Sequence, residues 1–212
     1  MPGTTELWLM LASATLLIGY HLWFLHELQT RPHRTTIGSA RALRAAWVAD
    51  VMTNRRDILA VQTMRNWVMT TSFLASTAAL ISVGLLTFLM SSDGVTNLIH
   101  RLNFAGTRSE DLLTLKLALI IVDFFVAFFN LSLAMRHYNY AVFLIGLSLA
   151  DEPDVAIARA TRHVQNGAMR YAAGMRGFYL TVPLVMWLFG PEWLLAGAAI
   201  VTLALWRHDH TG

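Results

Sequence analysis

The sequence predicts an all-α fold, a polytopic transmembrane helical bundle with four or five spans and cytoplasmic helical extensions. Three observations predict it. The 212 residues are 56% hydrophobic and only 14% charged, whereas soluble domains carry about 25% charged residues. Several apolar runs approach or exceed the ~20 residues that a helix needs to cross a bilayer. Arginines gather between these runs, where they set the topology of membrane proteins. We therefore expect one integral membrane domain over residues 1–212.

The first apolar run, residues 7–25, is expected to be the first span. Trp8 and Trp23 lie near its two ends, and tryptophan prefers the membrane interface. A cleaved signal peptide would have a basic residue before its apolar run. No basic residue precedes this run, so we expect the helix to be retained.

The connection that follows, up to residue 66, contains seven of the 16 basic residues of the chain. The positive-inside rule places it in the cytoplasm and the N-terminus outside. Leu43, Trp47 and Val51 recur at helical spacing among charged residues. We expect an amphipathic helical segment over residues 38–66, at the membrane surface or extending the bundle.

The second expected span, residues 67–90, is rich in small residues. Ser72 and Ser76 are four residues apart, and so are Ala75 and Ala79. Such pairs let membrane helices approach closely. The loop after it, residues 91–111, holds only two arginines, in agreement with an outside location.

The third expected span, residues 112–136, carries a polar stripe. Lys116, Asp123, Asn130 and His137 follow one another at intervals of seven residues. Seven residues are almost two helical turns. From one stripe residue to the next, the direction in which the side chain points therefore drifts by only about 20°. A carboxylate such as Asp123 near the bilayer centre costs at least roughly 2.5–3.5 kcal/mol, so the stripe must face protein or water.

Two interpretations of the stripe remain open. In the functional one, which is the function we expect, Asp123 and Lys116 line a path for protons or small ions; the alternative function is a non-catalytic structural or partner-binding membrane subunit. In the structural one, the stripe pairs with a neighbouring copy or with hydroxyl groups of the second span. Residues seven positions apart lie about 10.5 Å apart along the axis, so a partner on another helix or chain is favoured. Burying the stripe by self-association predicts a homo-oligomer.

A second cytoplasmic helical segment is expected over residues 138–170. One helix over residues 112–150 would be about 58 Å long, more than a ~30 Å hydrocarbon core. It must therefore extend into the cytoplasm or bend. Acidic residues and Pro153 then begin a new helix.

The last apolar stretch contains Gly190 and Pro191 and has two interpretations. The favoured one is a helical hairpin with spans over residues 171–189 and 191–207, which gives five spans and a cytoplasmic C-terminus. The other is one long span kinked at Pro191, which gives four.

The arginines beside the apolar runs predict contacts with anionic lipids or with an acidic ligand or partner, including another membrane protein. Six of them are candidates for these contacts: Arg41, Arg44, Arg55, Arg56, Arg136 and Arg176. The chain is basic, with a pI near 9.7. Because the charges flank apolar runs, we expect a membrane partner and no nucleic acid.

Candidates for cofactor binding are weak. His21 and His137 both fall near the expected inner edge and suggest a third interpretation, an electron carrier that binds b-type haem. A short His-Asp-His sequence, residues 208–210, lies on an expected frayed end. The chain has no cysteine, which excludes thiolate ligands. We expect no cofactor, no metal site and no catalytic residue, because phosphate-binding glycine loops and known catalytic motifs are missing.

Several local sequences resemble one known family. They are Ile58-Leu59-Ala60-Val61-Gln62-Thr63-Met64-Arg65-Asn66, Ala75-Ser76-Thr77, Lys116 with Asp123, Ala127-Phe128-Phe129, Tyr138-Asn139-Tyr140, Gly174-Met175-Arg176-Gly177-Phe178-Tyr179, Trp187-Leu188-Phe189-Gly190-Pro191 and Trp206-Arg207. From about residue 41 to residue 207 the chain resembles the domain of unknown function 599 family, uncharacterised membrane proteins of bacteria and plants. Gly177 stands where the family has a slightly larger residue. The resemblance implies a multi-pass fold in the bacterial inner membrane and implies no activity.

Overall fold

The structure, a computed structural model, describes residues 3–31, 34–91, 109–147 and 152–210. These ranges contain helices and no strand, so the all-α prediction is confirmed. The loop expected over residues 91–111 lies largely outside the described residues. The helices are α1 (Thr4–Thr30), α2 (Thr36–Thr53), α3 (Asp57–Leu89), α5 (Glu110–Gly146), α6 (Pro153–Met186) and α7 (Pro191–His210).

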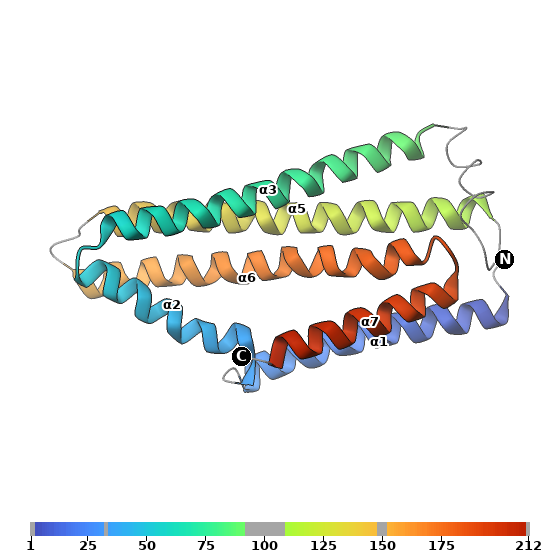
Figure 1. The fold of residues 1–212 in the computed structure, drawn as a ribbon, viewed down its shortest axis with the longest axis horizontal. Coiled ribbons are helices and arrows are strands. Elements are labelled where there is room, and N and C mark those ends of the chain that lie inside the picture. Colours follow the sequence, from blue (N-terminus) through green and yellow to red (C-terminus); the bar gives the residue numbers. More distant parts are fainter. Residues whose placement is uncertain (1–2, 32–33, 92–108, 148–151, 211–212) are drawn as a thin grey trace.

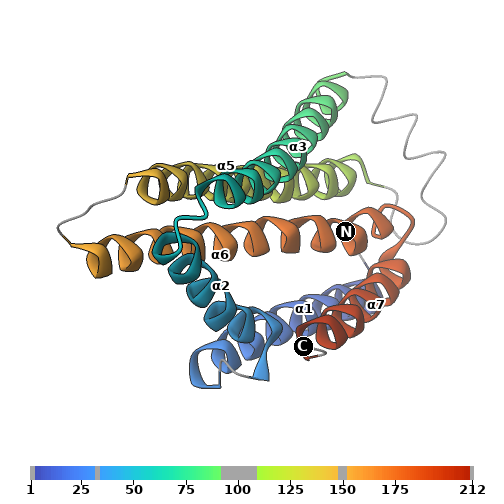
Figure 2. The same ribbon diagram turned by 60° about the vertical axis from the view of Figure 1, so that its left-hand side comes forward.

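The helices form two adjoining groups. The long helices α3, α5 and α6 run side by side, and α5 packs against both of the others (Figure 1). Helices α1 and α7 pair with each other along one side of α6, while the shorter α2 runs obliquely from the end of α1 to the start of α3 (Figure 2). Helix α5 therefore lies at the centre of the first group, and α6 joins the two groups.

Three helices, α1, α3 and α5, are long and apolar enough to cross a membrane. Helices α6 and α7 do not reach the same hydropathy, so the described residues do not by themselves establish four or five spans. The structure does describe residues 171–207 as a hairpin rather than one kinked helix. Helix α6 ends at Met186 and α7 starts at Pro191, and the two helices pack against each other (Figure 1). Gly190 makes this turn possible, because its φ of 151° lies in a region that favours glycine.

Helix α5 does not bend where the expected third span ends. The whole helix has 37 residues and is about 55 Å long. Its second half packs with α2 and with the first halves of α3 and α6. The buried side chains of this end are Val48, Val51, Ala60, Met64, Ala134, Tyr138, Ala141, Ile145, Ala160 and Val164. The helical extensions predicted on the arginine-rich side thus share one packed core.

The packing of α5 against α6 is very close because α6 presents glycines. A Cβ atom at Gly167 would lie 2.6 Å from Tyr138 Cε1, and one at Gly174 would lie 2.6 Å from Leu131 Cγ. Real Cβ atoms do not approach neighbours so closely, so a side chain there would push the helices apart. Small residues at such positions are the usual means of close approach between membrane helices.

We predict that Gly174→Val lowers the stability of the protein by about 1–3 kcal/mol, because overpacking forces α5 and α6 to separate. The matched control is Gly84→Val on α3, where a Cβ would have no neighbour within 4 Å. Thermal unfolding of both purified variants in detergent measures the difference. Equal melting temperatures for the two variants would contradict the close contact.

Candidate functional site

The candidate site is the contact between the polar stripe of α5 and the facing side of α6. At the N-terminal end of the stripe, Lys116 is buried, with 4% of its surface exposed. Its Nζ donates a hydrogen bond of 2.8 Å to the carbonyl of Trp187, the residue that ends α6. It also lies 5.3 Å from the centre of the Trp187 ring. A cation at a helix C-terminus is favourable, because the free carbonyls there carry partial negative charge.

Asp123 is the next residue of the stripe, seven residues after Lys116. It is half-buried and faces α6. Thr181 Oγ1 donates a hydrogen bond of 2.7 Å to its carboxylate. A Cβ atom at Gly177 would lie 2.9 Å from Ala127 Cβ and 3.6 Å from the other carboxylate oxygen, so glycine lets α6 approach α5 closely beside the acid. In the described part of the chain no basic side chain forms an ion pair with Asp123.

The C-terminal half of the stripe, Asn130 and His137, also contacts α6. Arg170 donates a hydrogen bond of 3.3 Å to the side-chain oxygen of Asn130. The Nδ1 atoms of His137 and His163 lie 3.1 Å apart. One Nδ1 must donate a hydrogen and the other must accept it. At least one of the two rings is therefore neutral, with no hydrogen on its Nδ1.

All four stripe residues therefore have a partner on α6 of the same chain. The sequence analysis favoured a partner on another helix or chain, and the structure places it on another helix. The hydroxyl groups of the second span are not that partner. Ser72 and Ser76 on α3 are exposed, and Thr71 donates to the carbonyl of Trp67 within its own helix.

The two histidines proposed as haem ligands are not brought together. The His21 ring contacts the carbonyl of Leu17 at 2.8 Å and lies edge-on to Tyr20 within α1. His137 lies in the other helix group, beside His163. Within the described ranges, no group of three or more histidine and acidic side chains gathers in a way that could hold a metal ion.

A buried ionic cluster at the end of α7 was missed in the sequence. Asp209 is only 3% exposed, and its carboxylate lies 2.6 Å from the Arg176 guanidinium. The Tyr20 hydroxyl donates a second hydrogen bond of 2.6 Å to it. Arg176 also covers the Phe24 ring at 3.9 Å. Residues 208–210 are thus helical rather than frayed, and Arg176, expected to contact lipid or a partner, is held in an ion pair within the chain.

Helical spacing could have revealed this cluster. The buried positions of α7 include Val201 and Leu205, and Asp209 follows at the same interval of four residues. An acid that continues the buried face of a helix is a candidate for a buried ion pair.

A second contact joins α7 to α1 beside this cluster. His210 Nε2 lies 3.1 Å from the Glu27 carboxylate, and its ring stacks on Trp23 with centres 5.4 Å apart. Hydrogen bonds to the Trp206 carbonyl and to Glu27 raise the pKa of His210 above its ordinary value.

The other candidate arginines have local contacts. Arg56 pairs with the exposed Asp50 at 3.1 Å. Arg136 lies 5.8 Å from the centre of the Tyr140 ring. Arg55 is exposed and has a φ of 50°, which indicates a tight turn between α2 and α3.

Arg41 and Arg44 differ from this group, because they lie on the side of α2 that faces α6. Arg41 contacts the sulfur of Met169 at 3.9 Å, and Arg44 donates a long hydrogen bond of 3.4 Å to the carbonyl of Ile37. Neither forms an ion pair with a described acidic residue.

We predict that Asp209→Ala destabilises the protein by up to about 3–5 kcal/mol, because it leaves the Arg176 charge largely buried without its partner. Asp50→Ala is the matched control, because it removes an acid from an exposed pair worth about 0–1 kcal/mol. Chemical or thermal unfolding in detergent compares the two. A loss at Asp209 no larger than that at Asp50 would show that the cluster does not support the fold.

We predict that the contact of His210 with Glu27 weakens as the pH rises. The folded-state pKa of His210 lies above the ordinary value of about 6.5. Its contribution is therefore complete below about pH 6.5 and is lost as the pH rises through the higher folded-state pKa. The stability difference between the native protein and His210→Gln should shrink between pH 6 and pH 9.

The control for this experiment is His26→Gln, which changes an exposed histidine near the same end of α1. The pH dependence measured for His210→Gln is compared with that of this variant. The contact would be refuted if the stability difference between the native protein and His210→Gln stayed constant or grew toward pH 9.

Comparison with known proteins gives a family but no activity. No curated protein and no solved structure matches the chain. The family model described as "Protein of unknown function, DUF599" matches residues 8–212, nearly the whole length. This agrees with the resemblance found in the local sequences, and the chain therefore belongs to the DUF599 family of proteins of unknown function.

Proposed function

We propose that this protein is a non-catalytic subunit of a membrane assembly, in which the polar stripe stabilises the fold and does not conduct ions. One observation supports this function above the others. Each of the four stripe residues takes its partner from α6 of the same chain. A polar group inside a membrane helix is costly when unpaired, so such pairs hold two helices together in a fixed register.

The packing between the polar pairs supports the same proposal. Successive stripe residues are about 10.5 Å apart along α5, too far for direct proton transfer. Between Asp123 and Asn130 the contact consists of Ala127 and neighbouring apolar side chains against Gly174 and Gly177, with no space for a Cβ atom. A path for ions along this contact would need water there, and water needs both room and polar partners.

The proposed setting is the bacterial inner membrane, which the chain crosses five times with its N-terminus outside. The α6–α7 hairpin supplies the fourth and fifth crossings. The arginine-rich connections at one end of the bundle support the orientation through the positive-inside rule.

Self-association remains part of the proposal, but through another surface than the stripe. Ser72 and Ser76 are exposed on α3, and Phe73 between them is 73% exposed. Small residues next to a large apolar one on a lipid-facing helix suit packing against a second copy or a membrane protein partner.

A second candidate function, a proton or small-ion path, is favoured by Asp123. This acid lies in the middle of an apolar helix with a threonine as its hydrogen-bond donor and without a described basic partner. Intramembrane carboxylates of this kind often belong to ion pathways. The weaker alternative, a haem-binding electron carrier, lacks such support, because His21 and His137 have different neighbours.

We predict that liposomes containing the purified protein conduct protons and potassium no faster than protein-free liposomes. Flux is followed with a trapped pH-sensitive dye after a pH jump, and with a potassium indicator. Asp123→Asn should leave this background unchanged. Thr181→Val, which removes the hydrogen-bond donor, should lower the melting temperature by an amount equivalent to about 1 kcal/mol.

Oligomer size is measured on the same samples, and Asp50→Asn serves as an exposed acidic control. Flux in the native protein that is lost in a correctly assembled Asp123→Asn variant would overturn the proposal and favour the ion path. No flux, together with unchanged stability and assembly in both the Asp123 and Thr181 variants, would contradict the stabilising role of the stripe.

A further inference from the structure

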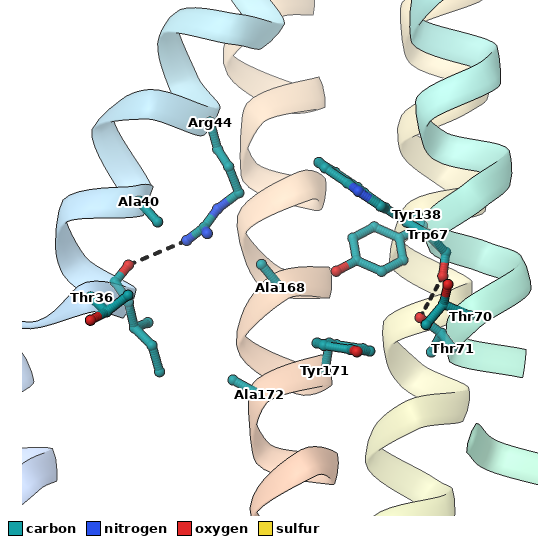
Figure 3. A pocket seen from close by; sticks show the side chains of 11 residues that line it. Thr36, Ala40, Arg44, Trp67, Thr70, Thr71, Tyr138, Ala168, Tyr171 and Ala172 are labelled. Carbon is teal, nitrogen blue, oxygen red and sulfur yellow. Dashed lines mark hydrogen bonds between the residues drawn. The ribbon is translucent and has the colours of Figure 1, made fainter. Parts of the chain in front are cut away.

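A pocket of about 410 Å³ opens between α2, α3, α5 and α6 (Figure 3). This volume lies within the range of about 300–1,000 Å³ that is usual for small-molecule sites. Ile37, Ala40, Trp67 and Ala168 form mainly apolar walls. The polar stripe of α5 does not line it, so the pocket is separate from the candidate site described above.

Arg44 brings a positive charge into this pocket from α2 (Figure 3). Its side chain is half-buried, and its Nε is buried without a hydrogen-bond partner. The guanidinium makes only the long bond to the carbonyl of Ile37. Burial lowers the pKa of Arg44 from its ordinary value, and no described carboxylate pairs with it. A half-buried guanidinium with free donors favours an anion as ligand.

A second arginine adds to the positive charge nearby. Arg41 lies three residues before Arg44, so both point to the same side of α2. The two side chains border an adjoining pocket of about 380 Å³, which Leu25 and Met169 also line. Two guanidiniums without described acidic partners therefore lie next to two neighbouring pockets that share Ile37 and Arg44 in their walls.

The Tyr138 hydroxyl adds a polar atom on the side of the pocket that faces Arg44, and Tyr171 also lines the pocket (Figure 3). Trp67 lies behind them at the start of the second apolar run. The site thus combines one cation and two phenols with an apolar wall. This is the composition expected for a ligand that has an anionic head and an apolar chain.

The position of the pocket identifies the source of such a ligand. It lies next to the inner ends of α1 and α7, where Thr36 at the start of α2 donates a hydrogen bond to the carbonyl of His208. Trp67, on another wall, has the residue type that prefers the membrane interface. The pocket therefore lies at the level of the lipid head groups on the arginine-rich side of the membrane.

We propose that this pocket binds one anionic phospholipid of the cytoplasmic leaflet, with the phosphate at Arg44 and the first part of one acyl chain against Trp67 and Tyr171. The proposal goes beyond the role proposed for the stripe, because it holds whether or not the stripe conducts ions, and it rests on the proposed orientation with the arginine-rich side in the cytoplasm. A zwitterionic lipid would bring a quaternary ammonium group toward Arg41 and Arg44, and the repulsion would disfavour it.

Native mass spectrometry of the full-length protein in detergent tests the proposal. Dioleoyl phosphatidylglycerol and dioleoyl phosphatidylcholine are titrated separately, and glycerol phosphate is added as a soluble competitor. We expect one phosphatidylglycerol to bind at least about tenfold more tightly than phosphatidylcholine, and glycerol phosphate to compete poorly. Arg44→Gln should weaken phosphatidylglycerol binding about tenfold or more, because charge-assisted hydrogen bonds are lost.

Two further variants make the result specific. Arg65→Gln removes the same charge from an exposed position of α3 outside the pocket and should change the affinity less than twofold. Ala168→Leu fills the pocket, keeps all charges and should weaken binding at least as much as Arg44→Gln. Circular dichroism verifies that each variant retains its helices.

Three results would overturn the proposal. Equal affinity for the two lipids would mean that Arg44 selects no anionic head group. Equal losses in the Arg44 and Arg65 variants would mean that general surface charge attracts the lipid. Competition by glycerol phosphate as strong as that by phosphatidylglycerol would assign the site to a soluble phosphate compound instead.

Discussion

The antiparallel contact between α5 and α6 is the interaction on which the rest of the structure depends. A bilayer offers no hydrogen bonds, so every polar side chain on α5 must find a partner within the protein. As the stripe proceeds along α5 from Lys116 to His137, its partners step backwards along α6 from Trp187 to His163. Glycines of α6 lie among these pairs and allow the helices to approach until the hydrogen bonds can form. The polar pairs thus fix the register of α5 and α6. The glycines of α6, which have no side chain, allow the short distance between the two helices.

The composition of α6 follows from this role. It must supply donors and acceptors to α5 and an arginine to α7, so it cannot be as apolar as α1, α3 or α5. For this reason a criterion of length and hydropathy finds three candidate spans and leaves out α6. Helix α6 lies between α5 and α7 (Figure 1). Thr181 contacts α5 and Arg176 contacts α7, whereas Arg159, Arg162 and Arg170 are exposed. Low hydropathy is therefore compatible with a place inside the bundle.

The sequence was sufficient for features that depend on one helix at a time. Seven-residue spacing identified the stripe, and Gly190 with Pro191 identified the hairpin. It could not identify which helix covers the stripe, because that depends on the packing of segments far apart in the chain. Two signals were nevertheless present. Gly167 and Gly174 repeat the stripe's interval on α6, and Asp209 continues the buried face of α7. Arg176 was misleading, because an arginine near an apolar run has the same sequence pattern whether it faces lipid or a buried acid.

Asp123 and Arg44 are both half-buried and have no described partner of opposite charge, but their surroundings give them different roles. The Thr181 hydroxyl donates a hydrogen bond to Asp123. Beside it, Gly177 lies so close to Ala127 that a Cβ atom would not fit. Asp123 is therefore hydrogen-bonded at a close helix contact, and it lines none of the pockets described here. Arg44 instead borders open volume, and its buried Nε has no hydrogen-bond acceptor. A protein does not gain stability from an unpaired half-buried guanidinium, because the desolvation of its charge is uncompensated. Of these two groups, the one whose surroundings are chemically incomplete is therefore Arg44 rather than the acid in the middle of α5.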